Sequence, residues 1–213
     1  MSIAYYSEWI AAVTATVCFF KYKHLPIRTI LLLLWITVIA ESAAIVWIKL
    51  GHTSNHWIYN IYAFCFYVII YKMVYDYIID VRRKKIVLLL SVLFFIGGTV
   101  RFLFIPRATD FLIHVNNAGM LLLVVLLLYY AIDLLKSDRP LNLKKQLELF
   151  IFSGYLFFGI SFIPLSIFVF GAEESVSKRA ISIFSDIQRI IVVIMYLIFT
   201  FGFIWTRPQT TGR

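Results

Sequence analysis

The stretch IRTILLLLWITVIAESAAIVWIKL, residues 27–50, decides the fold of this chain. Its middle is almost entirely apolar and carries a single charge, Glu41. A helix needs about 20 mostly apolar residues to cross about 30 Å of hydrocarbon, and this run is long enough to do so. We therefore interpret residues 27–50 as a membrane-spanning helix that holds a carboxylate in its interior.

The rest of the chain has the same character. Of its 213 residues, 62% are hydrophobic and only 15% are charged, whereas a soluble domain has about 25% charged residues. The other apolar runs of spanning length cover residues 3–20, 57–79, 86–105, 111–135, 148–170 and 180–205. The sequence predicts an all-α polytopic integral membrane protein, a bundle of about seven transmembrane helices that forms a single membrane domain over residues 1–213.

The positive charge indicates how the spans are oriented. The formal net charge is +9, and most of the Lys and Arg residues lie in loops on one side, such as KYKHLPIR, RRKK and KSDRPLNLKK. The positive-inside rule places these loops in the cytoplasm, with the N-terminus outside and the C-terminus inside a plasma or inner membrane. Basic loops between apolar runs meet anionic lipid headgroups, so we expect no nucleic-acid partner.

An internal repeat is suggested by the way two spans end. FFKYKHLPI (residues 19–27) and LLKSDRPLN (134–142) follow the same pattern, which indicates two parallel three-helix units joined by the fourth span. This arrangement resembles the three-one-three plan of the SWEET sugar transporters. That family carries a Pro-Gln or Pro-Asn pair within each repeat, whereas Pro208-Gln209 lies in the tail here. The alternative is that basic inner loops produce such matches by chance.

Charged and polar side chains gather in the outer half of the predicted bundle. Glu41 lies roughly 13 Å and Arg189 roughly 12 Å from the outer ends of their spans, at 1.5 Å per residue. A charge at the middle of a span costs about 2.5–3.5 kcal/mol, so we expect both residues to face the bundle interior, as an ion pair or in a hydrated pocket. The candidate ligand-binding residues are Glu41, Arg189, Asp186, Asn116, Asn117, His114, Asn60 and Arg101. The alternative is a polar lock that fixes helix packing without a ligand.

The inner end of the third span carries Lys72, Asp76 and Asp80, which we interpret as interfacial. Lys72 can extend to the interface, and the two carboxylates can meet the basic residues that follow. Those residues, Arg82, Arg83, Lys84 and Lys85, are a candidate surface for a cytoplasmic protein partner or an anionic lipid.

Three functional hypotheses follow. The first is a small-molecule or ion transporter, or a membrane sensor, with an outward-facing polar pocket. The second is an accessory protein that acts through partners docked on its basic cytoplasmic loops. The third is a lipid-modifying enzyme, which would need turnover that depends on Glu41 or His114. His52 and His56 lack an obvious third ligand, so we assign no metal site. We also assign no catalytic residue and no cofactor, and the sequence leans away from an enzyme.

Overall fold

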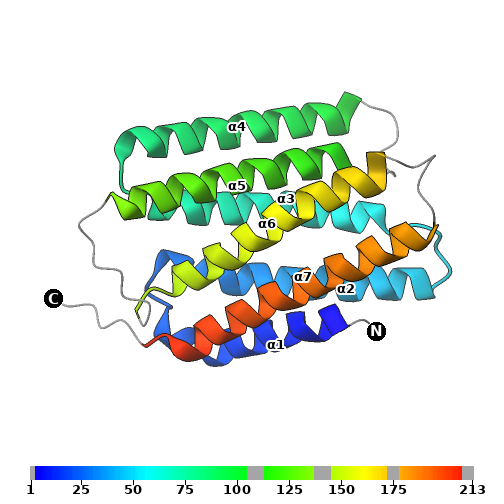
Figure 1. Cartoon of the computed structure of the whole chain (residues 1–213), viewed down its shortest axis with the longest axis horizontal. Helices are drawn as coiled ribbons and strands as arrows, with labels where there is room; N and C mark the ends of the chain where they lie inside the picture. The colour runs from blue at the N-terminus through cyan, green and yellow to red at the C-terminus, as the bar shows by residue number, and fades with distance from the viewer. Residues whose placement is uncertain (1–2, 105–112, 137–144, 172–177, 208–213) are drawn as a thin grey trace. The chain divides into compact units, whose positions relative to one another are not determined.

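The computed structural model describes residues 3–104, 113–136, 145–171 and 178–207 (Figure 1). These residues form seven α-helices, two short 3-10 helices and no strand, which confirms the all-α class. The α-helices are α1 (Ile3–Val17), α2 (Thr29–Lys49), α3 (His56–Tyr77), α4 (Val81–Phe104), α5 (Ile113–Leu135), α6 (Leu147–Gly171) and α7 (Lys178–Trp205). Most of the loop KSDRPLNLKK and the pair Pro208-Gln209 lie outside the described residues.

Five of these helical segments are long and apolar enough to cross a membrane. They are Pro26–Lys49, His56–Tyr77, Ile113–Leu135, Leu147–Ile167 and Ile181–Trp205, found among the residues that the structure describes. Helix α1 has only 15 residues, and α4 begins with a run of basic residues. The protein therefore has the helices of a multi-pass membrane protein.

The chain divides into two compact units. Unit 1 consists of Met1–Leu31 and Pro140–Arg213, and unit 2 of Leu32–Arg139. In unit 1, α7 packs against both α1 and α6, whereas in unit 2 the helices α3, α4 and α5 all contact one another. The three-one-three repeat is not confirmed, because α1 packs with a helix from the far end of the chain.

Small residues allow the helices of unit 1 to approach closely. A Cβ added to Gly154 of α6 would lie 2.5 Å from Phe199 Cε1, and one added to Gly202 of α7 would lie 2.6 Å from Phe150 Cβ. Such small residues are typical of packed helices in membranes. The Lys21 ammonium donates to the carbonyl oxygens of Phe203 (2.9 Å) and Ile204 (3.0 Å). It therefore supplies hydrogen-bond donors to carbonyl groups in the last turn of α7.

Unit 2 has an aromatic core where α3, α4 and α5 meet. Tyr67 and Tyr71 of α3 are each 2% exposed, and the ring of Phe94 from α4 contacts both at 5.2 and 5.6 Å. The Tyr71 hydroxyl donates to the carbonyl oxygen of Gly119 in α5 (2.7 Å). Buried tyrosines normally find such a partner for the hydroxyl.

Helix α4 begins five residues before the predicted start of its span. The reason is Asp80, whose Oδ1 accepts hydrogen bonds from the backbone N–H groups of Arg82 (2.7 Å) and Arg83 (3.1 Å). These bonds cap the helix and hold the pKa of the Asp80 carboxyl below its ordinary value. The basic run is therefore the first turn of α4 and not a loop.

Candidate functional site

Glu41 is half-buried on the side of α2 that meets α3. Its Oε2 accepts a hydrogen bond from the Tyr59 hydroxyl of α3 (3.0 Å). Within the described part of unit 2, no Lys, Arg or His forms an ion pair with this carboxylate. Counting back from Lys49, Glu41 lies about 12 Å from the C-terminal end of α2. A neutral hydroxyl therefore contacts a carboxylate that sits far from either end of its helix.

A second polar contact lies one helical turn from the first. Thr37 Oγ1 is 3.2 Å from the Tyr62 hydroxyl and donates its own proton to the Leu33 carbonyl oxygen (3.0 Å). Tyr62 must then be the donor in its contact with Thr37, because a hydroxyl has one proton to give. Thr37 and Glu41 are four residues apart on α2, and Tyr59 and Tyr62 are three apart on α3, so the two contacts share one interface.

Small side chains bring α2 and α3 together at this point. Ala40 and Ala44 are buried with Ile58, and Trp47, Tyr59 and Tyr62 pack against this cluster. The small side chains of Ala40 and Ala44 leave room for a neighbouring helix beside Glu41, and α3 is that helix. The polar centre, defined as Thr37, Glu41, Tyr59 and Tyr62, thus lies where side chains of α2 and α3 meet.

Aromatic side chains cover this interface at the end where α2 connects to α3. The Trp47 indole stacks on the His52 ring at 3.7 Å, and the Trp57 ring packs edge-on against Trp47 at 5.4 Å. The Trp47 Nε1–H donates to the carbonyl oxygen of Ser54 (3.0 Å). Tryptophan is enriched at membrane–water interfaces, so this group is suited to the outer boundary. Glu41 is six residues, or about 9 Å, below Trp47.

The predicted partner Arg189 lies on α7 in unit 1, whereas Glu41 belongs to unit 2. Its guanidinium Nη1 contacts Asp186 Oδ1 at 2.8 Å, and both side chains are exposed. Asp186 and Arg189 therefore lie on one face of α7, as their spacing predicted. The structure defines each unit by itself, and the pairing of Glu41 with Arg189 stays a prediction.

The other candidates divide between two places in unit 2. The Tyr67 hydroxyl donates its one proton to Asn116, whose backbone oxygen (2.7 Å) and Oδ1 (3.0 Å) both lie within hydrogen-bond distance. The structure thus connects Asn116 with the aromatic core, while Glu41 contacts Tyr59. Asn60 and Asn117 are half-buried, and His114 and Arg101 are exposed on their helices.

Sequence reasoning missed Asp133, which is 6% exposed near the end of α5. Its Oδ2 accepts the backbone N–H groups of Ile79 (2.6 Å) and Asp80 (3.3 Å), and its Oδ1 accepts from Arg83 Nη1 (2.9 Å). Lys72 and Asp76 pair with each other at 2.5 Å, so Asp76 contacts Lys72 and not the basic residues that follow α3. Arg83, however, pairs with Asp133 rather than with an acid of α3. We call Asp133, Arg83 and the turn Ile78–Asp80 the inner latch.

The only sequence signal for Asp133 was an isolated carboxylate in an apolar run, YYAIDLL, of residues 129–135. Its partners are two backbone amides and a side chain about fifty residues earlier in the chain, and no local pattern connects them. Comparison with known proteins adds no family or relative: no protein-family model, no curated protein and no solved structure matches this chain.

Proposed function

We propose that all seven helices cross the membrane as one bundle, with the N-terminus outside and the C-terminus in the cytoplasm of a plasma or inner membrane. Helix α4 supports this, because Leu89, Leu93 and Ile96 are exposed at lipid-like positions after its basic first turn. The Lys21 contact with the end of α7 also agrees, since the proposed topology places both on the cytoplasmic side. The three-one-three repeat stays a prediction.

We propose that this protein binds a small polar ligand or an ion at the polar centre and acts as a transporter or a membrane sensor. The observation that carries this proposal is the contact between Glu41 and a neutral hydroxyl deep in a spanning helix. An intramembrane charge is costly, and an acid in such a position needs a proton, a cationic side chain or a bound cation. We propose that the bound ligand or ion meets that need.

Other polar residues complete the proposed site. Asn117 and His114 of α5 would form part of its rim, and the inclusion of Asp186 and Arg189 of α7 stays a prediction. Asn116 is also part of the proposed rim. Its contact with Tyr67 would connect ligand binding at the polar centre to the aromatic core of unit 2. Asn60 and Arg101 would lie at the periphery.

A ligand screen on the Glu41→Gln variant tests this function. Gln keeps an acceptor for the Tyr59 hydroxyl but removes the charge, so a purely structural contact would survive the change. Purified protein is heated with sodium, potassium, magnesium, small alkylamines or monosaccharides. We expect at least one probe to stabilise the native protein, by about 2.7 kcal/mol at a hundredfold excess over Kd. E41Q should lose that effect.

Asp76→Asn serves as the matched control, because it neutralises a carboxylate that pairs with Lys72 near the other end of α3. This variant should keep the response to the probe, and Tyr59→Phe should weaken it. If E41Q responds to every probe as the native protein does, the polar centre is a helix-packing contact and the proposed function is wrong.

The accessory role remains a second candidate because part of the basic first turn of α4 is exposed. The lipid-modifying enzyme gains no comparable support. Glu41 contacts Tyr59, and His114 is exposed near the start of α5, so no described contact joins the two residues that such an enzyme would use.

A further inference from the structure

The four basic residues at the start of α4 are divided between two kinds of environment. Arg83 is held by the Asp133 carboxylate in the inner latch, and its side chain is 18% exposed. The Lys84 ammonium lies over the Tyr75 ring of α3, 4.6 Å from the ring centroid. Both cations therefore interact with partners within unit 2.

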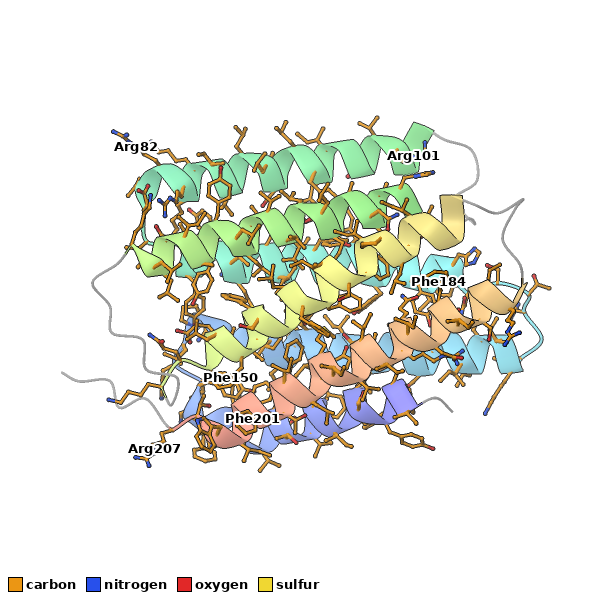
Figure 2. All side chains as sticks on the ribbon, viewed as in Figure 1. Arg82, Arg101, Phe150, Phe184, Phe201 and Arg207 are labelled. Carbon is orange, nitrogen blue, oxygen red and sulfur yellow. The ribbon has the colours of Figure 1, made fainter. Side chains whose placement is uncertain are left out.

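Arg82 and Lys85 have a different position. Both are exposed, and their spacing of three residues places them on one face of α4. Figure 2 shows the Arg82 side chain extending away from the helix at its first turn, with Arg101 at the opposite end of α4. Among the described residues, neither side chain forms an ion pair.

An apolar stripe continues this face along the helix. Leu89, Leu93, Ile96 and Val100 are 49–58% exposed and follow Lys85 at helical spacing. The opposite side of α4 faces the core of unit 2, where Val87 is fully buried and Phe94 contacts Tyr67 and Tyr71. The stripe is therefore an outer surface of the unit, and two cations stand at its end.

We propose that Arg82 and Lys85 bind the phosphate of an anionic phospholipid whose acyl chains lie along this stripe. A guanidinium offers a phosphate two parallel hydrogen bonds, and an ammonium adds a point charge. Ile96 lies about 16 Å along the helix from Lys85, which is close to the depth of one leaflet. Charge at the headgroup level and alkyl side chains below it match the two parts of a lipid.

The chemistry favours a lipid over a protein. An acidic protein segment would satisfy the two cations but would leave the alkyl stripe without a matching partner. A second copy of this chain would bring another Arg82 and Lys85 to the same end if the helices paired in parallel, and like charges repel. This proposal uses the membrane orientation above but does not depend on a ligand at Glu41.

Lipid titration of the full-length protein tests the proposal. Protein in phosphatidylcholine nanodiscs is compared with protein in discs of increasing phosphatidylglycerol content, with the melting temperature and lipid retention in native mass spectrometry as readouts. We expect phosphatidylglycerol to stabilise and remain bound to the native protein. R82Q/K85Q should bind it roughly tenfold more weakly or worse. The charge-preserving variant R82K/K85R should retain most of the response.

Two controls distinguish a specific site at Arg82 and Lys85 from nonspecific electrostatic attraction to an anionic membrane. K136Q/R207Q removes the same charge from two other exposed residues, and R83Q weakens the inner latch. Both should keep the phosphatidylglycerol response, although R83Q lowers the starting stability. An equal loss in K136Q/R207Q would overturn the proposal, and so would an unchanged response in R82Q/K85Q.

Two further results would also overturn it. If soluble glycerol phosphate stabilises the protein as well as the lipid does, the site recognises a free phosphate. If R82Q/K85Q changes the monomer–dimer equilibrium but not lipid retention, the face belongs to a contact between copies.

Discussion

Replacing Asp133 by alanine is expected to lower the free energy of unfolding by about 1–3 kcal/mol. The substitution leaves the Arg83 guanidinium and the N–H groups of Ile79 and Asp80 without their common acceptor. The Arg83 side chain is 18% exposed and the two N–H groups are partly buried, so the loss of their acceptor costs more than it would at a fully exposed site. Chemical unfolding of the purified protein in detergent micelles measures the loss.

The matched control is Asp76→Ala, which removes an acid from the same end of unit 2. Its partner Lys72 is 63% exposed, so the effect should stay below about 1 kcal/mol. A double-mutant cycle of D133A with R83A should show strong coupling, because removing both charges leaves no unpaired cation. If D133A unfolds like the native protein, the inner latch contributes nothing to stability.

Introducing a methyl group at Gly119 is the second change with a large expected effect. A Cβ there would lie 2.5 Å from Tyr67 Cζ and 2.8 Å from Phe94 Cζ. Tyr67 is 2% exposed and its hydroxyl is held by Asn116 of α5, so the ring has little room to move away from the added methyl group. We expect Gly119→Ala to cost about 1–3 kcal/mol of unfolding free energy, and Gly119→Val to cost more.

Gly97→Ala is the matched control, because nothing lies within 4 Å of the Cβ position at Gly97 of α4. Alanine is the better helix former, so this variant should be neutral or stabilised by about 0.5–1 kcal/mol. Combining G119A with Tyr67→Ala should cost less than the sum of the two single losses, because truncating Tyr67 makes room for the methyl group. Equal unfolding of G119A and G97A would contradict the close contact between α3 and α5.

The helices could be predicted from the sequence because a spanning helix needs only a long apolar run, and each predicted span overlaps an observed helix. The start of α4 could not be predicted in this way. Basic residues lower the hydropathy of residues 82–85, while the capping of their N–H groups by Asp80 favours a helix. Capping is a local geometric effect that a hydropathy average does not include.

The helix partners could not be derived either. Apolar runs do not indicate which helices adjoin, and the contact of α1 with α7 joins opposite ends of the chain. For the same reason depth alone suggested Arg189 for Glu41, while the contact found within unit 2 is Tyr59 on the next helix. Small neighbours such as Ala40 and Ala44 were the informative signal, since they indicate where two helices meet.

The accessibility of position 41 to water tests the central claim most directly. Cysteines are placed singly at Glu41, Ile39 and Ala44 in a variant without Cys18 and Cys65, and intact cells are treated with a membrane-impermeant thiol reagent. Ile39 is exposed at a lipid-like position and Ala44 is 1% exposed, so neither should react. The account predicts rapid modification at position 41 alone. Modification at position 41 as slow as at Ala44 would contradict a ligand site that opens to the outside.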